Sequence, residues 1–327
     1  MKILLTGATG FIGRALCKKL APDNNLLGLY HKKRPDFSLN MIWKQADLNN
    51  TSQIALICKE NPPDMVIHAG GISHEKYNIK TTDSYLKTNS RATKNLAMIA
   101  FNSNPNVCFI YLSSVSVYGD HPHAFPHMRI SHPVDEKSLC NPSGPYAKSK
   151  FNAEKHLIAL YDQNFLKKLV ILRLAPVYDY TNNLNLKRRV SAPFSLAHIR
   201  FGSGKQKISV LAKSNAADFI DFLICELNKT KKRYFNIINI CDATPMDFNT
   251  IINLFKNNKV LLCSQVIHFP IKFLALAAAI AGFLFPNKKK NIQSLYIKLA
   301  LDQVYDNRKM LCAGFKPKDS IETIFKR

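Results

Sequence analysis

The chain is short of acidic side chains: its 327 residues include 22 Asp and Glu against 46 Lys and Arg, a formal net charge of +24. A lysine-rich solvated surface accounts for part of this surplus, which also attracts anionic substrates, nucleic acids and anionic membranes. The sequence has no recognition-helix signature and no platform of aromatic and Arg residues, so we expect no nucleic-acid partner.

Paired cysteine motifs are also missing. The 8 cysteines are scattered, and none of them forms a C-x-x-C pair. In a chain of this size they are typical of reduced thiols in a cytoplasmic protein. The apolar run Met1–Leu5 is too short for a cleavable signal, so a cytoplasmic location is expected.

No uncharged apolar run has the length of a membrane span. Phe273–Phe285 contains 13 such residues, whereas about 20 are needed to cross a bilayer. We expect a buried or half-buried helix here. The alternative is an interfacial helix whose flanks, Lys272 and Lys288–Lys290, are attracted to anionic lipid, which would give weak peripheral contact with the inner membrane surface.

Short apolar strands alternate with helical stretches in the first half of the chain, a pattern that predicts a parallel sheet covered on both faces. The fold class is therefore α/β, a doubly wound Rossmann sheet with a smaller C-terminal substrate-binding lobe. We expect a dinucleotide-binding domain over residues 1–174 and the mixed lobe over 175–327, part of which returns to the first domain. The expected strands are Lys2–Leu5, Leu26–Tyr30, Met65–His68, Cys108–Ser113 and Leu169–Leu174, and the expected helices include Thr51–Glu60, Ser84–Phe101 and Ala216–Leu227.

A glycine-rich segment follows the first apolar strand, at Thr6–Gly13. Gly7 allows a tight turn out of the strand, and Gly10 has no side chain to hold the backbone away from a phosphate. Gly13 lets the next helix pack close to the sheet. Because this helix begins at the turn, its free amides favour an anion. A chance glycine turn is the alternative, and the strand before it and the helix after it disfavour that alternative.

A second motif lies about 130 residues further along the chain, where Tyr146 and Lys150 are four residues apart. With Pro145 at the start of a helix, the phenol and the ammonium share one helix face. A phenol with a pKa near 10 is a poor base at neutral pH, and a nearby cation lowers this pKa. The spacing therefore predicts a tyrosine that exchanges a proton with a substrate hydroxyl.

Together these motifs resemble the extended short-chain dehydrogenase/reductase superfamily, and within it the NAD-dependent epimerase/dehydratase family of nucleotide-sugar enzymes. The resemblance implies a cofactor site and a catalytic set of Ser114, Tyr146 and Lys150, with Ser113 and Ser116 as rival hydroxyls. It also implies substrate contacts from Ser114, Ser116, Tyr146 and Asn185. The implied cofactor contacts are Gly7, Gly10, Phe11, Ile12, Gly13, His31, Asp47, Leu48, Ala69, Gly70, Asn89, Tyr146 and Lys150.

The chain departs from this pattern in two places. Family members that dehydrate carry an Asp-Glu pair after the catalytic hydroxyl, whereas this chain has Val115 and Ser116, which disfavours a dehydratase. The second expected strand ends in Leu29–Arg34 without a carboxylate for the ribose of NAD. Its cations could instead pair with a 2′-phosphate, so the cofactor is predicted as NAD or NADP.

Four histidines (121, 123, 127 and 132) cluster between the serine-rich strand and Tyr146. Their segment is rich in proline and lacks helical spacing and cysteine partners. We therefore expect a loop over the substrate and no metal site.

The sequence predicts an NAD(P)-dependent nucleotide-sugar epimerase that acts at C4 of a UDP-hexose or UDP-N-acetylhexosamine through a 4-keto intermediate. The alternatives are an NADP-dependent 4-keto reductase and an oxidoreductase of the same fold on another small alcohol. A dinucleotide-binding protein without catalysis is disfavoured by the intact Ser, Tyr and Lys set. Cations of the lobe, Lys187, Arg188, Arg189, Lys205 and Lys207, are candidates for the substrate diphosphate. The resemblance further implies a homodimer.

Overall fold

The computed structural model describes residues 1–32, 35–36, 39–73, 81–119, 133–192, 196–261 and 265–326. The chain forms two compact units. The first contains Met1–Gly119, Cys140–Leu174 and Ala216–Ile238. The second contains Ala175–Asn215, Asn239–Arg327 and the described residues 133–139. The chain passes from the first unit to the second between Leu174 and Ala175, and Ala216–Ile238 belongs again to the first.

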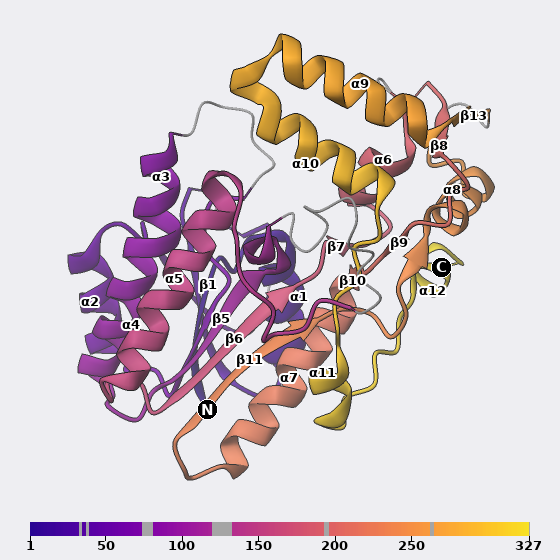
Figure 1. The fold of residues 1–327 in the computed structure, drawn as a ribbon. Helices are drawn as coiled ribbons and strands as arrows, with labels where there is room; N and C mark the ends of the chain where they lie inside the picture. Colours follow the sequence, from indigo (N-terminus) through magenta and orange to yellow (C-terminus); the bar gives the residue numbers. More distant parts are fainter. Residues whose placement is uncertain are drawn as a thin grey trace. The chain divides into compact units, whose positions relative to one another are not determined.

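A seven-stranded sheet forms the centre of the first unit, in the order β11-β6-β5-β4-β1-β2-β3 (Figure 1). The pairings from β6 to β3 are all parallel. The strand order reverses between β1 and β4, and ligands bind beyond the carboxyl ends of the strands at such a point. The strands are β1 (Lys2–Thr6), β2 (Asn25–Tyr30), β3 (Ile42–Gln45), β4 (Met65–His68), β5 (Cys108–Ser114), β6 (Lys168–Leu174) and β11 (Tyr234–Ile240). The predicted α/β fold class is confirmed.

Helices cover both faces of this sheet (Figure 1). One face carries α2 (Thr51–Glu60), α4 (Ala92–Ser103) and α5 (Gly144–Asp162), with α3 (Thr82–Leu86) and the π-helical turn η1 (Lys87–Arg91) leading into α4. On the other face lie α1 (Phe11–Leu20) and α7 (Lys213–Lys229), where Lys19 Nζ is 2.8 Å from Asp218 Oδ1. A 3-10 turn, η2 (Val115–Tyr118), follows β5.

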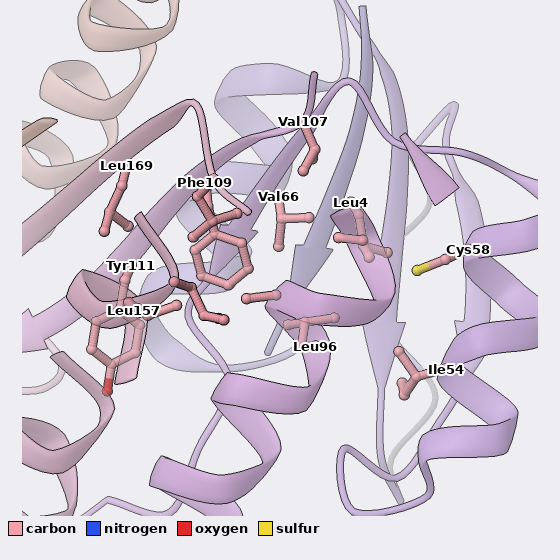
Figure 2. Packing of buried hydrophobic residues seen from close by; sticks show 14 of the residues in the cluster. Leu4, Ile54, Cys58, Val66, Leu96, Val107, Phe109, Tyr111, Leu157 and Leu169 are labelled. Atoms are coloured by element: carbon pink, nitrogen blue, oxygen red, sulfur yellow. The ribbon is translucent and has the colours of Figure 1, made fainter. Parts of the chain in front are cut away.

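The core of the first unit is apolar and fully enclosed. Figure 2 shows Leu4, Val66 and Phe109 from the strands packed against Leu96 and Leu157 from the helices. Each of these side chains is at most 3% exposed. Burial of a side chain of this size contributes about 1.5–3 kcal/mol, so the sheet that positions the site is rigidly held.

The second unit is built from short elements. Its strands pair as β7 with β10, β9 with β12 and β8 with β13, and its core includes Tyr178, Ile208, Phe248 and Phe255. The strands are β7 (Val177–Tyr178), β8 (His198–Phe201), β9 (Lys207–Ile208), β10 (Leu211–Ala212), β12 (Met246–Asp247) and β13 (Val266–Phe269). The helices are α6 (Leu184–Val190), α8 (Phe248–Asn257), α9 (Ile271–Leu284), α10 (Lys289–Ala300), α11 (Arg308–Cys312) and α12 (Ile321–Lys326), with the turn η4 (Pro286–Lys288).

Helix α9 corrects one prediction. Within it only Gly282 is buried, and Phe273 and Phe283 are 60% and 85% exposed. The expectation of a buried or half-buried helix is therefore wrong for Phe273, Leu276, Ile280, Phe283 and Leu284, whereas Leu274 is partly buried. No helix in the described part of the chain is long and apolar enough to cross a membrane.

Candidate functional site

The glycine turn joins β1 to α1 at the carboxyl edge of the sheet. Gly7 has φ +67°, a conformation that other residues rarely adopt. A Cβ on Gly13 would lie 2.0 Å from the Gly7 carbonyl oxygen, so helix α1 packs against the turn only without a side chain there. Gly10 caps α1 and is exposed, and Phe11 and Ile12 in the first turn are partly exposed. The first turn of the helix thus lies where its backbone amides could meet a pyrophosphate.

A buried hydrogen-bond chain fixes the loop after β4 beside this turn. The Gly70 amide donates to Thr6 Oγ1 at 3.0 Å, Thr6 Oγ1 lies 2.6 Å from His68 Nδ1, and His68 Nε2 lies 2.9 Å from Thr93 Oγ1. The Thr93 hydroxyl donates its proton to the Asn89 carbonyl, so it accepts from His68. The proton of the His68 ring is therefore assigned to Nε2. Burial first, and Lys150 second, lower the pKa of His68 to about 3. The imidazole is therefore neutral, and it braces Ala69 and Gly70 against β1.

Asn89 holds the same loop from the helix side. It is 1% exposed, and its Oδ1 accepts from the Ile72 amide at 2.7 Å. Its Nδ2 donates to the Ile72 carbonyl at 3.0 Å and to Ser149 Oγ at 3.1 Å. Asn89, expected as a cofactor contact, thus ties the loop after β4 to helix α5.

The ends of β2 and β3 place His31, Asp47 and Leu48 near one another. His31 Nε2 is 4.0 Å from Asp47 Oδ2, and both side chains are about half exposed. Backbone hydrogen bonding from Asn49 holds the pKa of Asp47 below its usual value, so this carboxylate stays charged. Leu48 Cδ1 would lie 2.8 Å from a Cβ on Gly70. This corner offers a carboxylate and an apolar wall to a nucleoside, while Lys33 and Arg34 lie outside the described residues.

Ser114 and Tyr146 meet at the carboxyl end of β5. Ser114 is the last residue of that strand, and Tyr146 lies in the first turn of α5, where Pro145 occupies a starting position. Burial of the phenol raises the pKa of Tyr146 to about 12, and a hydrogen bond with Ser114 opposes this rise. Serine and tyrosine hydroxyls therefore converge on one point, where a substrate oxygen would meet both.

Lys150 lies one turn further along α5 and is 7% exposed. Its Nζ donates to the Leu112 carbonyl at 2.7 Å and lies 4.7 Å from the centre of the Tyr111 ring. Burial lowers the pKa of Lys150 to about 8, and the charge of Glu154 opposes this. The ammonium is thus held against strand β5, and the phenol pKa of Tyr146 is set first by burial and then by Ser114.

The structure separates the three candidate serines. Ser113 Oγ donates to Glu154 Oε1 at 2.5 Å inside the core, whereas Ser114 faces Tyr146. Ser116 donates its amide to Ser114 Oγ at 3.2 Å, and its own hydroxyl has no hydrogen-bond partner among the described residues. Of the three, Ser114 is placed to share a substrate oxygen with the phenol.

This separation predicts three different outcomes for alanine variants. Ser114→Ala removes a hydrogen bond that lowers the Tyr146 pKa, so kcat is expected to fall about 10²-fold and the rising limb of its pH profile to move to higher pH. Ser116→Ala is expected to raise KM more than it lowers kcat. Ser113→Ala is expected to lower the free energy of unfolding by about 1–3 kcal/mol. Steady-state kinetics across pH and urea unfolding check all three, and a Ser113→Ala variant with the largest loss of kcat would contradict the assignment.

A buried ion pair that the sequence analysis missed lies behind these groups. Glu154, one turn beyond Lys150, is 0% exposed, and Arg173 of β6 is 4% exposed. Arg173 Nη2 donates to Glu154 Oε2 at 2.7 Å, and its Nε lies 3.2 Å from Oε1. Burial lowers the pKa of Arg173, but the hydrogen bond and the charge of the Glu154 carboxylate raise it by more. The pKa of Arg173 therefore lies above its usual value. The signal in the sequence was one charge, Arg173, inside the otherwise apolar run that follows Lys168 in strand β6.

Lys150 also leads to a stability prediction. Its pKa is about 8 in the folded chain and 10.5 as a model value, so between these pH values the unfolded chain binds more protons and stability rises with pH. At neutral pH the buried charge costs about 3 kcal/mol. Lys150→Met removes this cost and leaves the Leu112 carbonyl unpaired, which costs about 1–3 kcal/mol.

We expect Lys150→Met to unfold at pH 7 with a free energy equal to that of the parent or up to about 2 kcal/mol higher. The pH-dependent rise above pH 8 should disappear, and turnover should be lost. Urea unfolding at pH 7 to 10 measures this, with the exposed Lys148→Met on the same helix as the control. A loss of stability at pH 7 together with an unchanged pH slope would contradict the prediction.

Other expected site residues lie elsewhere in the chain. Asn185 is exposed on α6 in the second unit. Arg189 Nη2 donates to Gln303 Oε1 at 2.9 Å, and Nη1 donates to the Lys298 carbonyl, so this guanidinium holds the end of α10. The histidines 121, 123, 127 and 132 lie outside the described residues, and the described part contains no group of three or more His, Cys, Asp or Glu side chains that could hold a metal ion.

A cavity of about 560 Å³ opens at the other end of the sheet, lined by Lys2, Leu4, Asn25 and Leu27 among others. It lies at the amino ends of β1 and β2. Because ligands bind at the carboxyl ends in such sheets, this cavity is not the candidate site.

The strand order and the glycine turn define a dinucleotide-binding protein of the Rossmann class. The model of the NAD dependent epimerase/dehydratase family matches residues 3–241. The chain belongs to this family, and the predicted resemblance is confirmed. The family description names NAD as the cofactor, which favours NAD over the NADP alternative.

Individual relatives fit the same family. The chain is 30% identical over 227 residues to UDP-glucose 4-epimerase of Vibrio cholerae, a match that covers 67% of this chain and 65% of that protein. It is 25% identical over 261 residues to N-acetyl-alpha-D-glucosaminyl-diphospho-ditrans,octacis-undecaprenol 4-epimerase of Escherichia coli O157:H7, covering 76% of this chain and 70% of that protein.

A solved structure with the same fold is UDP-glucuronic acid 4-epimerase of Bacillus cereus, in complex with UDP-glucuronic acid and NAD. Its TM-score is 0.71 at 19% identity, and the comparison covers 100% of this chain and 97% of that one. At this identity the likeness shows the fold alone. The match to the Vibrio protein covers just under two thirds of that relative's length.

Proposed function

We propose that this chain is a nucleotide-sugar epimerase that inverts C4 of a UDP-hexose or UDP-N-acetylhexosamine through a 4-keto intermediate. The observation that carries the proposal is the hydrogen bond between Ser114 and Tyr146 at the carboxyl end of β5. It brings a proton-transferring phenol and an orienting hydroxyl to the sheet edge that carries the glycine turn.

The residues of the candidate site would have separate roles in this reaction. Gly7 and Gly13 let the turn pack against the loop after β4 and against helix α1, because a Cβ at either position would lie within 2.8 Å of backbone atoms. Gly10 leaves the turn without a side chain where a dinucleotide phosphate would approach. Bound NAD supplies the hydride acceptor and donor of the family's chemistry. Ser114 would donate to the substrate oxygen and hold it in place, while Tyr146 would take the hydroxyl proton and later return it.

The Tyr146 pKa must fall when this chemistry begins. Burial holds it at about 12, where a phenolate is rare at neutral pH. A cationic nicotinamide ring close to the phenol would lower the pKa toward the working pH. Proton transfer is therefore coupled to cofactor binding, and the phenol is a base only in the loaded enzyme.

The residues after Ser114 favour epimerisation over dehydration. Loss of water needs an acid and a base next to the reacting carbons. Val115 is 5% exposed and apolar, and Ser116 carries a hydroxyl with a high pKa. Neither side chain can supply the paired acid and base that the dehydrating members use.

The direct test is incubation of the purified chain with UDP-glucose or UDP-N-acetylglucosamine and NAD, followed by proton NMR. We expect the C4 epimer to form without accumulation of NADH. In a parallel sample supplied with a 4-keto nucleotide sugar and NADPH, consumption of NADPH in step with loss of the keto sugar would instead support the reductase alternative. A Tyr146→Phe sample provides the inactive control.

A lipid-linked sugar diphosphate is the second candidate substrate. The Escherichia coli relative named above acts on such a molecule by its name, and the exposed apolar side chains of α9 favour a substrate at a bilayer. Assaying N-acetylglucosaminyl-diphospho-undecaprenol beside UDP-N-acetylglucosamine under the same conditions distinguishes the two. The higher kcat/KM identifies the substrate.

The second unit and the assembly state complete the proposal. We assign residues 175–327, apart from the returning segment Ala216–Ile238, to substrate binding. We also propose a homodimer, as in the family resemblance. Light scattering after gel filtration tests the dimer, and a Lys187→Ala or Arg188→Ala variant with raised KM would support the substrate lobe.

A further inference from the structure

The apolar side chains of α9 lie on the outside of the second unit. Phe273, Leu276, Ile280, Phe283 and Leu284 are between 51% and 85% exposed. Successive helical residues are about 100° apart, so these five side chains form one stripe within about 100° of arc. A helix at a water-exposed surface normally turns its large apolar residues inward, and α9 has the reverse arrangement.

The inward side of α9 consists mainly of small residues, together with Ile271 and Leu274. Gly282 is the one buried residue of the helix, and Ala275, Ala278 and Ala281 are partly buried. Lys289 Cγ would lie 3.5 Å from a Cβ on Gly282. The small residues therefore let α10 approach closely, while the five large side chains of the stripe stay more than half exposed.

The charges around α9 are all of one sign. Between Asp247 and Asp302 the sequence has seven lysines and no Asp or Glu. Lys272 lies in the first turn of α9, and Lys288, Lys289 and Lys290 follow its end; all four are exposed. The apolar stripe thus has cations at both ends, an arrangement complementary to an anionic lipid surface.

We propose that α9 and its flanking lysines form a docking surface for a bilayer rich in anionic lipid. The 14 residues of α9 give a length of about 21 Å, too short to cross a hydrocarbon core of about 30 Å. The helix would lie in the plane of the interface, with the stripe in the acyl boundary and the lysines among the headgroups. Membrane docking is expected with either candidate substrate, and the vesicle test needs no turnover.

A second copy of the chain fits this surface less well. Lysine is depleted at the cores of protein interfaces. Two α9 helices placed side by side would bring lysine clusters together whether they ran parallel or antiparallel, because both ends are positive. Docking on anionic lipid brings no such repulsion between lysine side chains.

The test is vesicle flotation of the full-length purified chain with phosphatidylcholine vesicles, with and without phosphatidylglycerol. We expect binding to the anionic vesicles that weakens as salt increases. The triple variant Phe273→Ser, Leu276→Ser, Phe283→Ser should lose at least tenfold in binding. The matched triple Ile42→Ser, Leu56→Ser, Leu139→Ser, which removes exposed apolar side chains elsewhere, should bind as the parent does.

The lysines are tested in the same way. Each lysine near an anionic surface contributes about fivefold to binding, so Lys288→Gln, Lys289→Gln, Lys290→Gln should lose about tenfold or more. Lys231→Gln, Lys232→Gln, Lys316→Gln removes as many exposed lysines from other places and should lose less. Equal losses in the two triples would mean that only total charge matters, which overturns the proposal.

A depth measurement makes the result direct. The chain has one tryptophan, Trp43, so a Trp43→Phe, Phe283→Trp variant reports from the stripe alone. We expect its fluorescence to be quenched by lipids brominated near the headgroup end of the acyl chain. Vesicle binding without quenching would place the contact elsewhere. Light scattering of the stripe variant tests the remaining possibility. If that variant is a monomer while the parent is a dimer, the stripe contacts a second copy of the chain and not a bilayer.

Discussion

Replacing Tyr146 by phenylalanine is expected to lower kcat by about 10²–10⁴ and to leave NAD binding within about threefold. The phenol is the group that Ser114 meets at the end of β5, and Phe keeps the ring that lies 6.4 Å from the Tyr85 ring centre. Only the hydroxyl is lost. Steady-state turnover with a UDP-sugar and calorimetric titration with NAD measure the two effects separately.

Tyr161→Phe is the matched control, since Tyr161 lies near the end of α5 and stacks on Phe235. It should turn over as the parent does. If Tyr146→Phe kept most of its activity, the proton would be carried by another group and the assignment of Ser114 and Tyr146 would be wrong. If NAD binding collapsed as well, Tyr146 would act chiefly in holding the cofactor.

Breaking the pair of Glu154 and Arg173 is expected to produce the largest loss of stability. Arg173→Met leaves a carboxylate buried without its cation, and removing one partner of such a pair costs about 3–5 kcal/mol. The double variant Glu154→Leu, Arg173→Met removes both charges. It is expected to recover most of that loss, because well-packed apolar residues often replace a buried ion pair at no net cost.

Urea unfolding of the two single variants and the double variant gives the coupling free energy. The exposed pair Lys44 and Glu60, 3.5 Å apart, is the control, and Lys44→Met should cost less than about 1 kcal/mol. Glu154→Gln has a further expected effect, because the charge of Glu154 raises the pKa of Lys150. Its removal should lower that pKa. A double variant as unstable as Arg173→Met would show that packing around Glu154, and not its charge, dominates.

The elements with a strong local signal were predictable from the sequence. The expected strands at Lys2–Leu5 and Met65–His68 match β1 and β4 to within one residue, because both are continuous apolar runs beside a glycine turn or loop. The expected helix Thr51–Glu60 has the bounds of α2. Tyr146 and Lys150 share helix α5 as their spacing predicted.

The features that were missed depend on tertiary contacts. Strand β3 (Ile42–Gln45) has no buried residue, so no apolar run marks it. Part of the lobe was expected to return to the first domain, but sequence spacing does not show that the returning strand is β11 (Tyr234–Ile240) or that it lies beside β6. The ion pair of Glu154 and Arg173 forms only when α5 packs on β6. The sequence of α9 alone predicts a core helix, and its outward stripe is seen only once α9 packs on α10.

Identification of the bound nicotinamide cofactor tests the central claim most directly. The purified chain would be denatured and the released small molecules identified by mass spectrometry, with NAD titrated into any empty protein. We expect stoichiometric NAD, or tight binding of added NAD, which the glycine turn after β1 and the loop after β4 would hold. A chain that binds neither NAD nor NADP would contradict the proposed site, and with it the reaction assigned to Ser114 and Tyr146.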